Sequence, residues 1–188
     1  MRTMIALLLV GFTLNSASAF TTAFSRWWGE SGGRLATFIL RNVLGIPLWV
    51  GGVILAARAA SPPVFDTTGA TDALGWVLMG LGAVVQTLAL AALRLKAARP
   101  SVDDELVARG VYAHVRHPIY TGLLLEFAAM VLLKPRHSVA VAAVLGCVWA
   151  LLQARLEEVD LVQRMPAYRE YMKRVPRFFP SLVRKTWG

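Results

Sequence analysis

Two short segments hold most of the residue types that could bind or transform a charged small molecule. The first, residues 106–122, reads LVARGVYAHVRHPIYTG, and the second runs from Glu157-Glu158 to Pro180. Both mix ionisable groups with tyrosines, which suits charge-assisted hydrogen bonds and cation–aromatic contacts. His114 and His117 could ligate a metal, but zinc needs three or four protein ligands and no third one is evident. We therefore expect no metal site.

Each of these residues also has an ordinary structural interpretation. Arg116 could be a cation that snorkels from the end of an apolar helix, and Pro118 suits a first helical turn. Asp160 and Arg164 are spaced i,i+4, which predicts an ion pair on one helix face. Tyr168 and Tyr171 are expected to pack at a membrane interface. The combination of the two segments, more than any single residue, favours a site.

Long apolar runs separate the two segments and predict an all-α, polytopic membrane bundle. Hydrophobic residues make up 56% of the 188 residues and charged residues only 16%, against about 25% charged in typical soluble domains. A helix needs about 20 apolar residues to cross a bilayer core. About five stretches approach or reach this: 3–24, 35–60, 73–95, 118–133 and 138–156. The last two are close-linked through residues 134–137, so we expect a helical hairpin that returns the second segment to the membrane surface of the first.

Charge asymmetry predicts the orientation of the spans. Loop 61–72 has no Lys or Arg and carries Asp66 and Asp72. Residues 96–117, with Lys96 and Arg99, and the tail after residue 154, with Lys185, are cationic and belong in the cytoplasm by the positive-inside rule. The net charge of +9 is therefore assigned to a membrane surface, and no nucleic-acid partner is expected.

The N-terminal apolar stretch has two interpretations. Residues 1–24 could be a signal peptide with a small-residue cleavage site at residues 17–19. Cleavage would export Arg26 and Arg34 and invert every later span, so a retained span with Met1 outside is favoured. We expect a single membrane domain, with three spans in residues 1–95 and a second part, residues 96–188, that consists of the hairpin 118–156 and the cytoplasmic tail.

The motifs together resemble those of one known family. The order LVxxGxYxxVRHPxYxG, a hairpin, EExxL and YxxYxxxVPxxxP resembles the isoprenylcysteine carboxyl methyltransferase family, which is related to the membrane phospholipid methyltransferases. The likeness covers residues 96–180. It implies a multi-pass enzyme, expected in a bacterial inner membrane, that binds S-adenosylmethionine on its cytoplasmic face. The implied reaction is methyl transfer to a lipidic or small apolar carboxylate, amine or thiol, such as the carboxylate of an isoprenylcysteine.

The resemblance assigns roles to particular residues. It implies cofactor contacts from the first segment and from Glu157, and it places Arg116 and Glu158 at motif positions for which we predict a catalytic role. The expected cofactor contacts of the first segment are Leu106, Val107, Tyr112, His117, Pro118, Ile119 and Tyr120. These types suit the cofactor, because an acid fits its sulfonium or amino group and tyrosines can stack on adenine.

The expected substrate residues are less regular. Where the carboxyl methyltransferases of the family have a substrate-associated arginine, this chain has Gln153, with Arg155 two residues further on, and Gln163 and Arg164 replace a usual aromatic pair. Both departures weaken the case for a prenylcysteine substrate. Glu126 lies about two turns into a span, where a lipid-facing carboxylate is costly, so we expect it to bond to Gln86 or to line the acceptor path.

Two other functions remain open on the sequence. A non-catalytic membrane scaffold could keep the same fold and cofactor motif, and a channel or transporter is disfavoured because Gln86 and Glu126 are the polar groups noted deep in the spans. Gly75, Gly80 and Gly82 are expected to let helices approach closely. The sequence leaves the methyl acceptor and the oligomeric state open.

Overall fold

The computed structural model describes residues 1–94 and 105–180, and within those residues the regular structure is helical. Lys96, Arg99 and Lys185, which entered the orientation argument, lie outside the described residues. The helices are α1 (Arg2–Ala17), α2 (Thr21–Phe38), the π-helical η1 (Ile39–Gly45), α3 (Ile46–Arg58), α4 (Gly69–Leu93), the 3-10 turn η3 (Gly110–Ala113), α5 (Pro118–Leu133), α6 (His137–Arg164) and α7 (Tyr168–Arg174). The expected all-α membrane bundle is confirmed.

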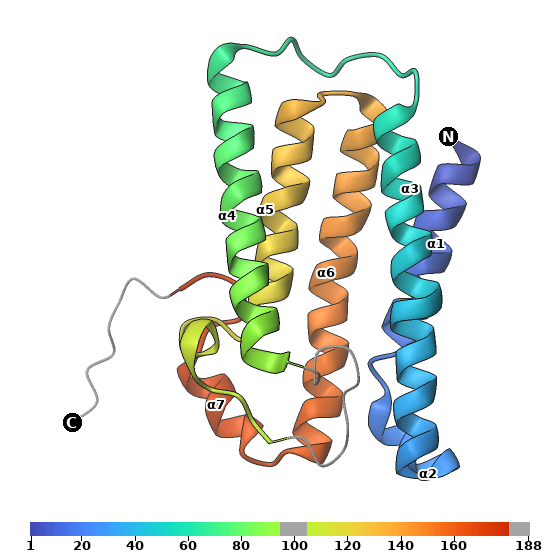
Figure 1. Ribbon diagram of the computed structural model, residues 1–188, viewed down its shortest axis with the longest axis vertical. Coiled ribbons are helices and arrows are strands. Elements are labelled where there is room, and N and C mark those ends of the chain that lie inside the picture. Colours follow the sequence, from blue (N-terminus) through green and yellow to red (C-terminus); the bar gives the residue numbers. More distant parts are fainter. Residues whose placement is uncertain (95–104, 181–188) are drawn as a thin grey trace, which may run out of the picture.

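Within the described residues, three apolar helical stretches are long enough to cross a membrane. They are Thr21–Arg58, Gly69–Leu93 and His137–Arg164, while α1 and α5 are apolar but shorter. Figure 1 shows α1, α3, α4, α5 and α6 side by side along the longest axis of the molecule. The N-terminus, the loop between α3 and α4 and the turn between α5 and α6 lie at one end. The short helix α7 and the bend before α2 lie at the other.

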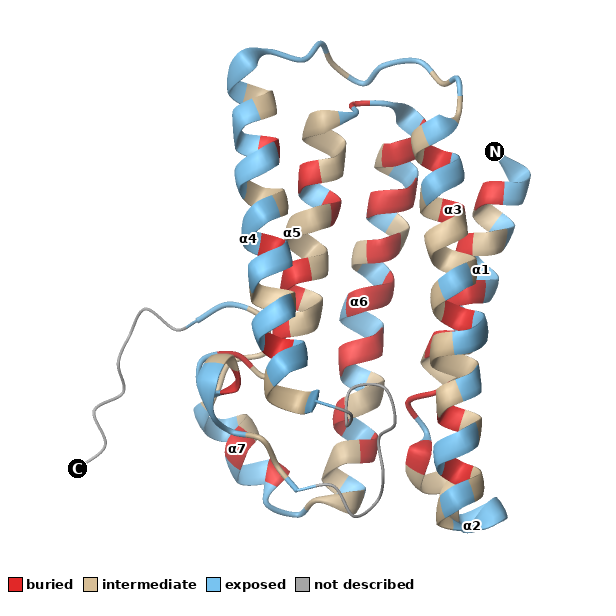
Figure 2. Cartoon of the chain, viewed as in Figure 1, coloured by how far each residue is buried: buried red, intermediate tan, exposed pale blue. Residues whose placement is uncertain are grey.

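The surface of the bundle is apolar in the way that lipid contact requires. Large hydrophobic side chains such as Trp76, Val84 and Val144 are exposed, and Figure 2 shows exposed residues on the outer faces of α4 and α6. Contiguous exposed apolar surface is unusual in a soluble monomer. Such a surface fits the hydrocarbon layer.

The tightest helix pair is α4 with α5, and its glycines explain the close approach. A Cβ built on Gly82 would lie 2.8 Å from the Gly122 carbonyl oxygen, and one on Gly122 would lie 2.7 Å from the Gly82 carbonyl oxygen. Gly75 similarly meets Leu133, whereas a Cβ on Gly80 would meet nothing within 4 Å. The prediction of close packing therefore holds at Gly75 and Gly82 and is wrong at Gly80.

The apolar runs and the helices differ at three boundaries. Residues 3–24 contain nearly all of α1 and the start of α2, because α1 stops at Ala17, where Ser18 donates its hydroxyl to the Asn15 carbonyl at 2.5 Å. Helix α2 begins well before the apolar run and bends at Gly29, whose φ of 71° suits glycine. Helix α6 continues to Arg164, two turns beyond its apolar run.

The loop between α3 and α4 contacts the turn between α5 and α6, and these contacts tie the helices together at the end opposite α7. The Val64 amide donates to the Pro135 carbonyl at 2.6 Å, and the His137 amide donates to the Pro62 carbonyl at 3.1 Å. Lys134 Nζ also lies 3.4 Å from the Ala57 carbonyl oxygen near the C-terminus of α3. Cations are favourable at helix C-termini, so this lysine stabilises the end of α3.

Candidate active site

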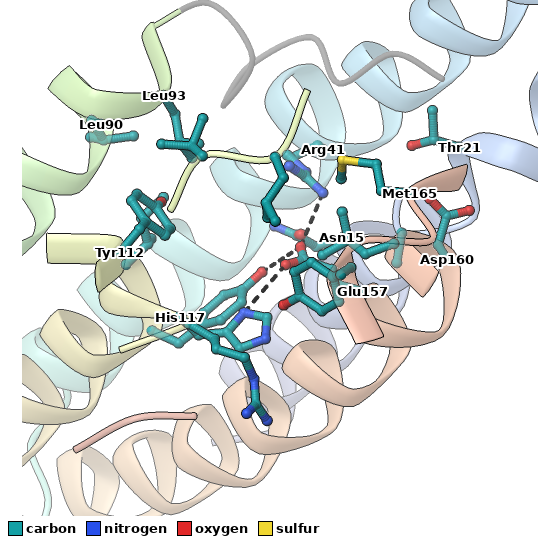
Figure 3. A pocket seen from close by; sticks show the side chains of 18 of the residues that line it. Asn15, Thr21, Arg41, Leu90, Leu93, Tyr112, His117, Glu157, Asp160 and Met165 are labelled. Atoms are coloured by element: carbon teal, nitrogen blue, oxygen red, sulfur yellow. Dashed lines mark hydrogen bonds and ion pairs between the residues drawn. The ribbon is translucent and has the colours of Figure 1, made fainter. Parts of the chain in front are cut away.

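A cavity of about 560 Å³ lies toward the end of the bundle that carries α7. Its wall comes from every part of the fold: α1, the stretch from α2 to α3, α4, the segment before α5, α5, α6 and α7. Figure 3 shows Arg41, His117 and Glu157 pointing toward one another within it. Residues 106–122 and the segment that begins at Glu157 therefore meet here, as expected if residues 118–156 form a hairpin.

Glu157 is the carboxylate at the centre of this arrangement. Its Oε1 accepts hydrogen bonds from Tyr120 at 2.6 Å, Arg41 Nη2 at 3.1 Å and Gln153 Nε2 at 3.1 Å. Its Oε2 lies 3.9 Å from His117 Nδ1, which is beyond hydrogen-bonding distance. Hydrogen bonds from η1, α5 and α6 thus hold Oε1 in place, whereas Oε2 is less closely held.

Glu158 has a different environment from its neighbour. Arg116 Nη2 lies 2.9 Å from Oε1, His117 Nε2 lies 3.2 Å from the same oxygen, and Arg177 Nη2 lies 2.5 Å from Oε2. The side chain is 5% exposed. Three donors around a buried carboxylate make a fully paired ion cluster. This cluster joins α6 to the start of α5 and to the segment after α7.

The Val-Pro motif after α7 lies along the start of α5. The Arg116 amide donates to the Pro176 carbonyl at 2.9 Å, and the His117 amide donates to the Arg177 carbonyl at 3.0 Å. The Thr121 hydroxyl lies 2.7 Å from the Phe178 carbonyl oxygen. These bonds satisfy backbone groups at a helix N-terminus, where four amides lack partners within the helix. They also fix the backbone on which Arg116 and His117 sit.

Three buried tyrosines form the wall on the α7 side. Tyr171 donates its hydroxyl to the Tyr112 carbonyl at 2.5 Å, and its ring lies 5.4 Å from that of Tyr168. Burial raises the pKa of Tyr171 to about 12 and also raises the pKa values of Tyr112 and Tyr168. All three are therefore neutral near pH 7 and can offer an aromatic face or a hydroxyl.

Aromatic residues from four helices make the apolar side of the site. The Phe12 and Trp149 rings stack 4.7 Å apart, and Trp49 lies 5.8 Å from Trp149. Tyr120 meets Trp149 edge to face at 5.9 Å. Trp49, Trp149 and Tyr120 line the cavity. Such a wall favours a molecule with an apolar part.

Most of the residues expected to contact a cofactor line this cavity. They are Leu106, Val107, Tyr112, His117, Ile119, Tyr120 and Glu157, and Arg116 joins them. Pro118 is buried at the start of α5 and outside the described wall. Their roles stay predictions, because the geometry brings them together without a bound molecule.

The expected substrate residues lie outside the described cavity wall. Gln153 is fully buried behind Glu157, Arg155 is exposed, and Glu126 packs beside Gly82 at the α4–α5 contact. Glu158, like these three, is outside the wall. All four assignments stay predictions.

The sequence predicted the ion pair between Asp160 and Arg164, but it did not predict the contacts of Asp160 with Thr22 and of Glu157 with Arg41. Arg164 Nε lies 3.1 Å from Asp160 Oδ2, which confirms the i,i+4 pair. Asp160 also accepts a hydrogen bond from the Thr22 amide at 2.9 Å and so holds the start of α2 against α6.

Arg41 lines the cavity but was not among the site residues predicted from the sequence. Its signal was visible, since it is a cation within the apolar run 35–60, and an ionisable residue inside a span suggests function.

A sequence model of the isoprenylcysteine carboxyl methyltransferase (ICMT) family matches residues 74–163. The match includes the whole of the first chemical segment and the start of the second, as far as Gln163 in α6. The nickel-cobalt-cadmium resistance protein NccN of Alcaligenes xylosoxydans xylosoxydans is 32% identical over 154 residues, 79% of this chain and 69% of that protein. The chain belongs to the ICMT family. The resemblance drawn from the motifs is confirmed.

Other relatives of this ICMT-family chain have names that describe a reaction. A methanethiol S-methyltransferase of Pseudomonas deceptionensis is 37% identical over 91 residues, 48% of this chain and 34% of that protein. Methanethiol S-methyltransferase 2 of Bradyrhizobium diazoefficiens is 25% identical over 195 residues, 94% of this chain and 72% of that protein. No solved structure matches. The family and its relatives support a membrane methyltransferase.

Proposed function

We propose that the chain is an S-adenosylmethionine-dependent, multi-pass membrane methyltransferase whose donor binds in the cavity around Glu157. The observation that carries the proposal is the convergence of Glu157, His117 and Tyr120 in one cavity with the aromatic wall. When bound, the donor supplies a methyl group on a positively charged sulfur. The chain supplies orientation and exclusion of water, which are the main needs of an in-line transfer.

The residues present fit such a donor. The less closely held Oε2 of Glu157 suits the donor's ammonium group, which can give it a short and strong charge-assisted hydrogen bond. The negative charge of the carboxylate also attracts the sulfonium, which has no hydrogen to donate. Tyr112, Tyr168 and Tyr171 suit an adenine ring. Arg94, which is exposed, also lines the cavity and suits a carboxylate. The cavity volume of about 560 Å³ is within the range of about 300–1,000 Å³ for small-molecule sites.

For the acceptor we propose a small apolar thiol. Two observations support it: the aromatic side of the cavity at Trp49 and Trp149, and relatives named methanethiol S-methyltransferase. Gln153 at the position of the family's arginine weakens the prenylcysteine alternative. The resistance protein names of other relatives state no reaction, so a donor-binding scaffold is the second candidate.

Glu157→Gln tests the donor site. The substitution keeps the shape of the side chain and removes its charge, so we expect donor affinity to fall by about 10- to 100-fold, the equivalent of one hydrogen bond to a charged group. His117→Ala should act in the same direction. The measurement is calorimetric titration of purified protein in detergent with S-adenosylmethionine, with melting temperatures in parallel.

The control for this experiment comes from the surface. Glu170 pairs with Lys173 at 2.7 Å on the exposed face of α7, and Glu170→Gln should leave donor affinity unchanged. Asp160→Asn is unsuitable, because Asp160 is buried and holds Thr22. Wild-type affinity in both Glu157→Gln and His117→Ala would remove the donor from this cavity. Donor binding without methyl transfer to any short thiol would favour the scaffold.

A further inference from the structure

The two ring nitrogens of His117 have different surroundings. Nε2 lies 3.2 Å from Glu158 Oε1, within hydrogen-bonding distance. Nδ1 points toward Glu157 Oε2 at 3.9 Å, which is too far for a hydrogen bond. The ring lines the cavity, yet its side chain is only 4% exposed. The family resemblance assigns His117 a contact with the donor, and the orientation of its ring indicates a second role.

The surroundings of Glu158 decide which nitrogen of His117 carries a proton. The guanidinium groups of Arg116 and Arg177 lie 2.9 Å and 2.5 Å from the two oxygens of Glu158, and positive charges at such distances favour the ionised carboxylate. An ionised carboxylate can only accept hydrogen bonds. Nε2 therefore donates to Glu158 whether the ring is neutral or charged, so Nδ1 is the nitrogen that gains or loses a proton.

Packing and backbone contacts hold the His117 ring in this orientation. Its ring centroid lies 5.7 Å from that of Tyr120 and 6.2 Å from that of Phe178. The His117 amide donates to the Arg177 carbonyl at 3.0 Å, which fixes the backbone below the ring. A group that transfers a proton must be held at the reacting atom in this way, because catalysis depends on orientation.

We propose that His117 is the general base of the reaction and takes the proton of the acceptor thiol on Nδ1. This inference rests on the proposed methyltransferase function and adds the proton acceptor that a neutral thiol needs. The ordinary pKa of a cysteine thiol is about 8.5, so only a small fraction is thiolate at neutral pH. The thiolate is the nucleophile. A positioned base typically contributes about 10²- to 10⁴-fold to the rate.

Protons, electrons and charge balance in this step. The S–H bond of the thiol breaks as its proton moves to Nδ1, and the electron pair of the thiol sulfur forms a bond to the methyl carbon. The bond from that carbon to the donor sulfur breaks, and its electron pair stays on the donor sulfur, which becomes neutral. His117 is left as an imidazolium between the carboxylates of Glu157 and Glu158, which attract its positive charge. It then returns the proton to water.

Other charged or titratable groups surround His117 and must be separated from its own effect on a pH profile. They are Glu157 and Glu158 on α6, Tyr120 on α5, Arg116 before α5, Arg177 after α7 and Arg41 on η1, which reaches Glu157. A variant that lacks the basic nitrogen of His117 must therefore accompany each pH profile.

NMR of the protein labelled with ¹⁵N-histidine, in detergent and without a donor, measures where the ring proton lies. The chain has three histidines, and His114→Gln and His137→Gln assign the signals of His117. We expect the neutral ring to carry its proton on Nε2 and to gain a second proton on Nδ1 as the pH falls. A neutral ring with its proton on Nδ1 overturns the proposal.

Kinetics provide the second arm, as kcat/KM against pH for ethanethiol and for the more acidic trifluoroethanethiol at saturating donor. In the wild-type protein we expect the rising limb at the same pH for both thiols, because it reports loss of a proton from His117. His117→Gln keeps an N–H for Glu158 but has no basic nitrogen, so its limb should follow the pKa of each thiol. At pH 7 the variant should lose about 10²- to 10⁴-fold with ethanethiol. It should lose less with trifluoroethanethiol, which ionises more readily by itself.

The matched control is Glu170→Gln, which removes an exposed pair with Lys173 and should leave both pH profiles unchanged. Equal losses for the two thiols in His117→Gln would mean that His117 acts through the donor alone, and the inference would be wrong. A wild-type limb that follows the pKa of each thiol would overturn it as well. The NMR spectrum and the wild-type limbs need no variant of His117 to fold. Absence of donor binding in the wild-type protein would instead refute the proposed function.

Discussion

The adjacent carboxylates of Glu157 and Glu158 differ in what surrounds them. Glu157 lines the cavity, whereas Glu158 is enclosed by Arg116, His117 and Arg177 outside the described wall. Two consecutive residues on a helix point about 100° apart, so one can face the cavity while its neighbour faces the segment after α7. The doublet thus supplies both a candidate ligand group and the ion cluster that positions His117.

The cluster around Glu158 leads to a stability prediction. Glu158→Gln leaves buried cations without their counter-ion, and breaking a buried pair in this way costs about 3–5 kcal/mol. We expect a lower melting temperature in detergent, whereas Glu170→Gln on the surface should melt like the wild type. A Glu158→Gln protein that keeps its melting temperature but loses methyl transfer would contradict this expectation and support a catalytic role for Glu158.

At the scale of elements, the contact of α4 with α5 carries Gln86 and Leu90 to the cavity wall. Gly82 and Gly122 permit it, since each would direct a Cβ onto the backbone of the other helix. Gly80 lies on the same helix only two residues away and faces open space. Gly82 and Gly80 therefore offer a comparison in which only the packing around the glycine differs.

Gly82→Ala should be destabilising and Gly80→Ala should not. The added methyl at Gly82 forces the helices apart, and overpacking of this kind costs about 1–3 kcal/mol. At Gly80 the alanine gains up to about 1 kcal/mol of helix propensity. Thermal unfolding of the two variants in the same detergent measures the difference. Equal melting temperatures would mean that the α4–α5 contact is not held at Gly82.

The elements show what sequence patterns can and cannot predict. Apolar length predicted Pro118–Leu133 and nearly all of α4, because hydrophobicity alone decides whether a segment sits in lipid. The apolar run that predicts α6 ends at residue 156, whereas α6 itself continues to Arg164. Backbone hydrogen bonds can continue a helix into water without apolar side chains. Apolar length also could not show that Asp160 reaches Thr22 or that Arg41 reaches Glu157. Those contacts depend on how separate spans pack.

At the scale of the whole molecule, charge is distributed unevenly between the two ends. The N-terminus of α1, the C-terminus of α3 and the α5–α6 turn hold Arg2, Arg58, Lys134 and Arg136. The opposite end holds many more cations, among them Arg26, Arg34, Arg109, Arg116, Arg164, Arg169, Lys173, Arg174 and Arg177. This asymmetry favours the cytoplasm for the end that carries α7 and the cavity.

Accessibility of single cysteines in intact cells tests that orientation. Thr67, in the α3–α4 loop, and Lys173, on α7, are both exposed and lie at opposite ends of the bundle. Cys147 is the one native cysteine, so each new cysteine is placed in a Cys147→Ala background. We expect a membrane-impermeant maleimide to label Thr67→Cys in intact cells and Lys173→Cys only after permeabilisation. The reverse pattern would place the cavity outside and refute the proposed topology. Labelling of both in intact cells would show that the chain does not separate these two ends across the membrane.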